Sequence, residues 1–237
     1  AKNRIRLYNI PVIPDNYFIE LQEAQGAIKE LIAELNKSPI NIDNLNMRVK
    51  QQEFVAIVGP SGCGKSTLLN ILGLLEDWSD GTVELFGQPL PLLNSKRAIM
   101  LRRNTINYLF QSFALISNKT VKENLYLATY FKKIDNNRRD KLIDQILTEL
   151  DIFHTKGEQV SILSGGEQQR VALARTILKP GDLVLADEPT GALDDQHAKE
   201  ALNYVIQLRD KYQKTVIMVT HNLEHAQHAD RIIYLNK

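Results

Sequence analysis

The sequence predicts an α/β fold in which buried parallel strands alternate with helices. Short apolar runs typical of strands covered on both faces occur at 54–58, 183–186 and 215–220. Apolar residues at helical spacing follow over 66–75 and 198–212. A glycine-rich turn joins the first of these strands directly to a helix, which is typical of a phosphate-binding loop. The 237 residues are enough for one or two domains with a sizeable core.

Composition and charge exclude several other classes of protein. Hydrophobic residues make up 43% and charged residues 24%, which is typical of a soluble globular protein and excludes wholesale disorder. The net charge of +1 gives no long-range attraction to nucleic acid, so we expect no nucleic-acid partner. The longest apolar runs are far shorter than the ~20 residues of a membrane-spanning helix, and no apolar signal segment begins the chain. We therefore expect a cytoplasmic chain.

The first forty residues carry a strand pattern followed by an amphipathic helix pattern. Apolar and polar residues alternate over 5–10, as in a half-buried edge strand, until Pro11 and Pro14 interrupt the pattern. From 18 to 35, apolar residues recur every three or four positions, which predicts a helix that ends before Pro39. This helix is either packed on the domain or a docking arm for a partner. Apolar and polar residues alternate again over 40–49, before the first buried strand.

The middle of the chain departs from the α/β pattern. Strand patterns occur at 82–86 and within 101–110. Between 113 and 160 the pattern becomes helical, with helices predicted over 121–131 and 138–150. This segment is therefore predicted to be an inserted helical subdomain, after which helices and buried strands alternate again.

The glycine-rich turn at 59–67 reads GPSGCGKST and fits G-x-x-x-x-G-K-[ST]. Its backbone N–H groups can turn inward around phosphates, where the following helix N-terminus adds its positive end. Lys65 is placed to reach the β- and γ-phosphates, and the Ser66 hydroxyl to bind Mg²⁺. Cys63 is interpreted as a tolerated small residue rather than a redox switch. The candidate phosphate-binding residues are Gly59, Pro60, Ser61, Gly62, Cys63, Gly64, Lys65, Ser66 and Thr67.

Two adjacent carboxylates follow the apolar strand at 183–186. Such a strand end lies at the edge of an open α/β sheet where ligands bind. Asp187 is predicted to hold Mg²⁺ through its water shell, and Glu188 to polarise the attacking water as a general base. An Asp-Glu pair alone is more often a solvated strand end, so this assignment depends on the phosphate-binding loop upstream.

Residues 163–170, LSGGEQQR, resemble the signature sequence of ATP-binding cassette (ABC) ATPases. Three further motifs of that family match in the correct order. Gln111 resembles its Q-loop glutamine, residues 191–194 (GALD) resemble its D-loop, and His221 resembles its switch histidine after the strand at 215–220. The resemblance covers 40–237 closely.

The resemblance implies a fold class and a domain organisation. The whole of 1–237 is implied to be one ABC ATPase domain: an α/β P-loop NTPase nucleotide-binding domain with an antiparallel β subdomain and an inserted helical subdomain at 113–165. Residues 11–39 are then an atypical helical insertion after the first strand. Such proteins place an aromatic residue that stacks on adenine shortly after the first strand, where this chain has the insertion. Tyr17 or Phe18 is the candidate for that role here. The chain also stops at Lys237, where relatives continue through a hairpin, as in a compact variant or a trimmed chain.

The resemblance also implies how the site works, with ATP and Mg²⁺ as cofactors. Two nucleotide-binding domains of such proteins close head to tail around two ATP molecules, which implies a homodimer. The signature residues of one subunit would touch the γ-phosphate held by the other, and the D-loop aspartate would touch the partner. The implied catalytic residues are Glu188, His221, Gln111 and Lys65. The implied Mg²⁺ contacts are Ser66, Gln111 and Asp187, and the ATP-site residues beyond the loop are Ser164, Gly165, Gly166 and Asp194.

Within ABC ATPases, the segments 110–116, 118–124 and 186–191 most resemble the bacterial branch of macrolide and peptide exporters and lipoprotein releasers, closest to lactococcin-type bacteriocin-export ATPases. This implies an ATP-hydrolysing subunit at the cytoplasmic face of the cell membrane. It would drive export of a peptide, bacteriocin or antibiotic through separate integral membrane permease subunits, with 112–124 as the contact. The alternatives are a soluble ABC ATPase acting on ribosomes or DNA and a non-hydrolysing scaffold gated by ATP.

The other four histidines fit no motif and are expected on helical or loop surface. His225 and His228, at i and i+3, could bind a metal but lack further evident ligands. These residues, to which we assign no function from the sequence, are His154, His197, His225 and His228.

Overall fold

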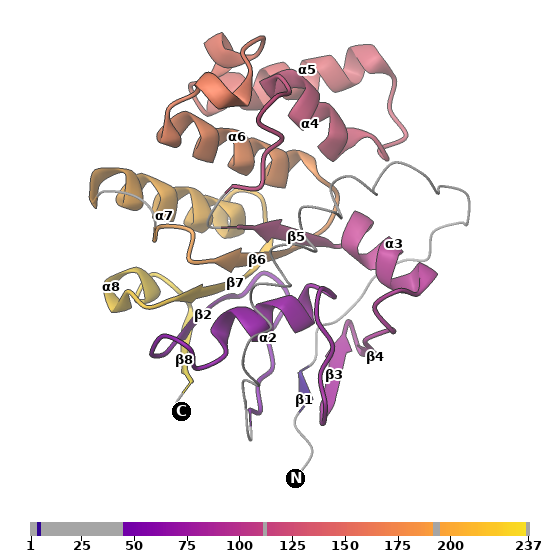
Figure 1. The fold of residues 1–237 in the computed structure, drawn as a ribbon, viewed down its shortest axis with the longest axis vertical. Coiled ribbons are helices and arrows are strands. Elements are labelled where there is room, and N and C mark those ends of the chain that lie inside the picture. Colours follow the sequence, from indigo (N-terminus) through magenta and orange to yellow (C-terminus); the bar gives the residue numbers. More distant parts are fainter. Residues whose placement is uncertain (1–3, 6–44, 111–112, 192–194, 236–237) are drawn as a thin grey trace.

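The computed structural model describes residues 4–5, 45–110, 113–191 and 195–235 (Figure 1). Its larger sheet has five parallel strands in the order β5-β6-β7-β2-β8. These strands are β5 (Ile106–Leu109), β6 (Leu183–Asp187), β7 (Thr215–Thr220), β2 (Phe54–Val58) and β8 (Arg231–Tyr234). A smaller sheet pairs β3 (Thr82–Leu85) antiparallel with β4 (Gln88–Pro89) and parallel with β1 (Arg4–Ile5). The predicted α/β fold with a parallel sheet and a small antiparallel sheet is confirmed.

Strand β2 is buried over its whole length because helices cover both faces of the large sheet. Successive side chains of a strand point to opposite faces. Phe54, Ala56 and Val58 accordingly pack into the core beneath α6 (Gly165–Leu178) and α7 (Asp195–Asp210). Val55 and Ile57 pack into the core beneath α2 (Lys65–Leu72). This double burial explains why β2 reads as an unbroken apolar run.

Helices dominate the segment between β5 and β6, at the upper end of Figure 1. Helices α4 (Val121–Thr129) and α5 (Asn136–Glu149) pack on α6, with Leu125, Ile143 and Leu147 fully buried between them. Two short 3-10 helices, η1 (Phe153–Thr155) and η2 (Val160–Ile162), lead into α6. That 113–165 form a distinct subdomain of one 1–237 domain stays a prediction.

One helix of the structure was not predicted from the sequence. The chain forms a helix, α3 (Lys96–Asn104), before β5, which the strand pattern over 101–110 did not anticipate. Its N-cap Ser95 accepts a hydrogen bond from the Ala98 amide, whereas the helix itself is mostly polar and buries only Ala98.

The described part of the alternating segment before β2 is not a strand, although Met47 and Val49 are buried. The predicted helix over 18–35, the insertion at 11–39 and the rest of the first strand lie outside the described residues. No described helix has the length and apolar character needed to cross a membrane.

Two lysines, Lys214 buried and Lys179 partly buried, lie at the opposite end of the sheet from the phosphate-binding loop. Lys179, at the end of α6, donates through Nζ to the carbonyls of Arg102 (2.8 Å) and Ile106 (2.6 Å). Lys214, before β7, donates to the carbonyl of Gly181 (2.6 Å). Burial lowers the pKa of Lys179 and of Lys214 to about 8. Backbone carbonyls thus hold both ammonium groups away from water, where a charge is unfavourable.

We expect the free energy of unfolding to rise between pH 8 and pH 10. An unfolded lysine has a pKa of about 10.4, whereas both folded values lie near 8. The unfolded state therefore binds more protons across this window, and stability increases with pH. Urea unfolding at pH 8, 9 and 10 measures this. Lys214→Met should reduce the rise, and Lys141→Met on the exposed surface of α5 is the matched control. A flat profile in the unmodified protein would contradict the expectation.

Candidate active site

The loop between β2 and α2 requires glycine at several positions. Gly62 and Gly64 have φ values of 75° and 98°, in the left-handed region that side chains disfavour. A Cβ atom on Gly59 would lie 2.5 Å from the carbonyl oxygen of Leu235 and 2.7 Å from Sγ of Cys63. The loop is therefore closely packed between the start of α2 and the end of β8. Its backbone can approach a ligand as no side-chain-bearing loop could.

Two side chains at the start of α2 face polar partners. Lys65 is only 7% exposed, and its Nζ donates to the carbonyls of Gly59 (2.9 Å) and Pro60 (3.0 Å). The hydroxyl of Ser66 donates to Oδ1 of Asp187 at 3.0 Å. The loop after β2 and the carboxyl end of β6 thus meet through this hydrogen bond.

The environment of Asp187 suits a cation. Burial, followed by the neighbouring charge of Glu188, raises the pKa of the Asp187 carboxyl, and the Ser66 hydroxyl offsets this only in part. A hydroxyl and a carboxylate are hard oxygen donors of the kind that Mg²⁺ prefers. Among the described residues no cluster of three or more His, Cys, Asp or Glu side chains could hold a metal alone. Water and substrate phosphate oxygens would complete such a site, as is usual for Mg²⁺.

Glu188 and His221 form the second polar pair of the site. Oε2 of Glu188 lies 3.0 Å from Nδ1 of His221 and accepts from its backbone amide at 3.4 Å. Glu188 adopts φ 43°, a left-handed conformation that a non-glycine residue holds only where its surroundings enforce it. Its amide donates to the carbonyl of Val219 on β7 at 3.1 Å. The strained backbone therefore turns the carboxylate toward the end of β7.

The turn after Glu188 is held by two residues to which the sequence analysis assigned no role. Gln169 of α6 donates to the carbonyl of Pro189 at 3.3 Å. Nδ1 of His225, in α8 (Leu223–Ala226), lies 2.9 Å from the hydroxyl of Thr190. The sequence spacing of His225 and His228 suggested only a metal, and no sequence signal links position 225 to position 190.

The signature residues lie at the N-terminus of α6. Ser164 is the N-cap of this helix, and Ser164 and Gly165 are exposed. A Cβ atom on Gly166 would lie 3.2 Å from the ring of His197, so α7 approaches the helix closely here. The predicted polar side chains therefore fall into two groups: Lys65, Ser66, Asp187, Glu188 and His221 around the strand ends, and Ser164 with its own helix.

Gln111 and Asp194 lie outside the described residues, as do Tyr17 and Phe18. The segment just after Gln111 is nevertheless anchored. Arg175 of α6 donates to the carbonyls of Phe113 (2.8 Å) and Ala114, and burial lowers its pKa to about 10. Both carbonyls belong to residues with positive φ, 62° and 47°. Sequence reasoning missed Arg175 because its helical position resembles that of any polar residue of α6.

Comparisons with known proteins agree on one family. The model of the family described as "ABC transporter" matches residues 42–191. The bacitracin export ATP-binding protein BceA of Halalkalibacterium halodurans is 35% identical, over 90% of this chain and 84% of that protein. The macrolide export ATP-binding/permease protein MacB of Psychrobacter arcticus is 36% identical over 90% of this chain, which spans only 32% of that protein. A dimeric post-hydrolysis structure of the ATP-binding cassette MJ0796 with ADP and Pi superposes with a TM-score of 0.72, at 36% identity over 81% of this chain and 84% of that one.

We expect Gly59→Ala to destabilise the protein and deform the phosphate-binding loop. The added Cβ would overlap the Leu235 carbonyl and the Cys63 sulfur, and overpacking of this kind costs about 1–3 kcal/mol. Urea unfolding and a titration with a nucleoside triphosphate measure the two effects. Gly157→Ala is the matched control, because a Cβ atom there has open space. Unchanged stability and unchanged nucleotide binding in Gly59→Ala would contradict the close packing of the loop.

Proposed function

Since the chain belongs to the ABC transporter family and is an ATPase of that type, we propose that it drives export through separate membrane permease subunits. One observation supports the chemistry: the pairs Ser66–Asp187 and Glu188–His221 form at the ends of β6 and β7, and Lys65 lies at the start of α2, hydrogen-bonded to carbonyls of the loop. The similar proteins BceA and MacB are described as export proteins, which supports export as the direction of transport. The cargo is a peptide, bacteriocin or antibiotic, with a lactococcin-type bacteriocin as the most specific candidate.

Residues around the loop hold the triphosphate and its Mg²⁺ ion. The loop amides and the α2 N-terminus face the phosphates. Lys65 turns from its loop carbonyls toward the β- and γ-phosphates as a charge-assisted donor. Ser66, Asp187 and Gln111 would hold the ion, which would supply positive charge to offset that of the phosphate oxygens. Placing a cation beside Asp187 also offsets the unfavourable burial of its charge.

Glu188 is the general base for the attacking water. Its position beside His221 supports this role, since the histidine ring and amide both contact the same carboxylate oxygen, Oε2. That leaves Oε1 to accept the water proton. His221 orients the carboxylate and, with Gln111, contacts the γ-phosphate or the water.

A second copy of the chain completes each ATP site. Ser164, Gly165 and Gly166 of one subunit contact the γ-phosphate held by Lys65 of the other, and Asp194 contacts the partner. The dimeric ATP-binding cassette MJ0796 supports this arrangement. The exposure of Ser164 and Gly165 at a helix N-terminus also supports it, because such an end attracts anions.

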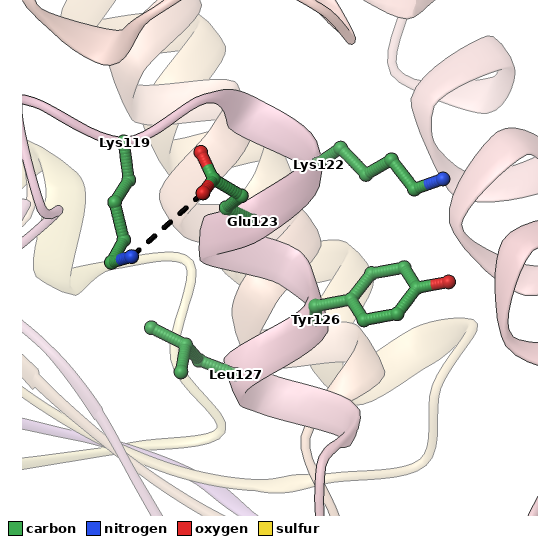
Figure 2. Close-up of a pocket in the computed structure, with 5 residues that line it drawn as sticks. All are labelled: Lys119, Lys122, Glu123, Tyr126 and Leu127. Atoms are coloured by element: carbon green, nitrogen blue, oxygen red, sulfur yellow. Dashed lines mark ion pairs between the residues drawn. The ribbon is translucent and has the colours of Figure 1, made fainter. Parts of the chain in front are cut away.

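The permease docks on the helical segment around α4. A hollow of about 410 Å³ lies there. Figure 2 shows the residues that line it, which are Lys119, Lys122, Glu123, Tyr126 and Leu127. Leu127 is 49% exposed on this surface, beside the Lys119–Glu123 ion pair. An exposed leucine with a tyrosine beside it and charged side chains around them resembles the apolar centre and polar rim of a protein contact. The hollow overlaps the segment 112–124, and docking there places the chain at the cytoplasmic face of the membrane.

We expect Glu188→Gln to bind ATP but to lose hydrolysis by about 10²- to 10⁴-fold, because the amide cannot accept the water proton. The variant should accumulate as a dimer in Mg-ATP, measured by size-exclusion chromatography. Lys65→Ala serves as the comparison: it removes a charge-assisted phosphate contact and should weaken ATP binding about ten- to hundredfold. Undiminished turnover of Glu188→Gln would contradict its role as the base.

Affinity purification of the full chain in mild detergent, with crosslinking, tests the exporter assignment. We expect a multi-helix membrane subunit to be recovered. Leu127→Glu should reduce that recovery by placing a charge in the hollow. Leu92→Glu is the matched control, because Leu92 is also apolar and is 81% exposed outside the hollow. Recovery of ribosomes or DNA without a membrane protein would overturn the assignment in favour of a soluble ABC ATPase.

A further inference from the structure

The signature helix α6 begins with a reciprocal hydrogen-bond pair between Ser164 and Glu167. The Ser164 hydroxyl donates to Oε2 of Glu167 at 2.6 Å, and the Ser164 amide donates to the same oxygen at 2.9 Å. In return, the amide of Glu167 donates to the Ser164 hydroxyl oxygen at 3.3 Å. This is a capping box, in which two residues satisfy the free amides of a helix end.

A third residue, His154, joins this pair from η1. Its Nε2 lies 3.1 Å from Oε1 of Glu167, the oxygen that Ser164 does not use. The η1 turn is anchored on either side of the histidine by Ile152 and Thr155, which are both buried. Hydrogen bonds from Ser164, and then from His154, lower the pKa of Glu167. Since an ionised carboxylate can only accept, Nε2 of His154 carries the hydrogen of this contact.

The single hydroxyl hydrogen of Ser164 limits what this residue can bind. A phosphate oxygen accepts hydrogen bonds, so Ser164 must donate its hydrogen to contact the γ-phosphate. In this structure that hydrogen is already donated to Glu167. Binding phosphate therefore requires the short bond to Glu167 to break. The carboxylate would also lie near the phosphate, where like charges repel each other.

We propose that Glu167 and His154 are positioning residues that set how readily Ser164 binds the γ-phosphate of the ATP held by the partner subunit. This inference rests on the proposed function of Ser164. Glu167 retains the Ser164 hydrogen in the absence of phosphate. His154 donates a hydrogen bond to Glu167 and so draws on the negative charge of that carboxylate. Glu167 therefore holds the Ser164 hydrogen less tightly and repels phosphate less strongly.

A purely structural role of the carboxylate is the competing interpretation. Helix α4 has the same capping box between Thr120 and Glu123, with a hydroxyl-to-carboxylate distance of 2.9 Å. That box has no histidine contact among the described residues; its carboxylate instead faces Lys119 at 3.8 Å. Capping therefore explains the glutamate of α6, but it does not explain the contact with His154. Binding measurements separate the two interpretations.

Dimerisation in Mg-ATP is measured by sedimentation velocity, with every variant made in the Glu188→Gln background. Glu167→Gln keeps an acceptor for the helix cap but removes the charge. We expect the ATP concentration for half-maximal dimer to fall about three- to tenfold. Asp135→Asn is the matched control, because it makes the same change at the N-cap of α5. An unchanged half-maximal concentration in Glu167→Gln would overturn the proposal.

His154 is tested in both Glu167 backgrounds. His154→Ala should raise the half-maximal ATP concentration about twofold, a modest effect because the histidine side chain is 66% exposed. His154→Arg, which keeps an N–H donor for Glu167, should restore it. In the Glu167→Gln background His154→Ala should have no effect, since its charged partner is gone. An equal shift in both backgrounds would overturn the role of His154.

Ser164→Ala separates this proposal from the function on which it rests. We expect it to abolish the ATP-dependent dimer. If Ser164→Ala abolishes the dimer but Glu167→Gln dimerises at the same ATP concentration as the Glu188→Gln protein, only the positioning role is overturned. If the dimer forms unchanged in Ser164→Ala, the composite ATP site and the positioning role are both overturned.

Discussion

The burial of β2 between β7 and β8 is the constraint on which the candidate active site depends. A strand covered on both faces must be apolar and hydrogen-bonded on both edges, which leaves only its carboxyl end free for polar chemistry. Because all five strands run parallel, the polar residues that follow β2, β6 and β7 emerge at the same edge. The contacts of Ser66 with Asp187 and of Glu188 with His221 are consequences of this shared edge.

Helix α6 connects this edge to more distant parts of the molecule. Its N-terminus carries Ser164, its middle contacts the turn after Glu188 through Gln169, and its last turn holds the carbonyls of Phe113 and Ala114 through Arg175. Lys179 then ties the end of the helix to the start of β5. A shift of α6 would therefore affect the signature, the catalytic turn and the segment after Gln111 together.

The sequence predicts the parts of the fold and site that leave a local pattern. The buried strands, the glycine loop and the acidic pair after β6 each do so, and the α/β fold and the ATPase activity are confirmed. The contacts of His225 with Thr190, of Arg175 with Phe113 and of His154 with Glu167 join elements distant in sequence, so no periodicity marks them. Helix α3 was not predicted because its nine residues bury only Ala98 and so lack an apolar stripe. The roles of Gln111 and Asp194 stay predictions.

The close approach of Leu235 to Gly59 has a consequence for how the protein is made. Strand β8 hydrogen-bonds to β2, the amide of Leu235 donates to the carbonyl of Val58, and the carbonyl of Leu235 lies against the start of the phosphate-binding loop. A loop near residue 60 is therefore completed by a strand synthesised some 170 residues later. Pairing over so long a separation forms late in folding. During synthesis on the ribosome, the phosphate-binding loop therefore gains its contact with Leu235 only after β8 has emerged.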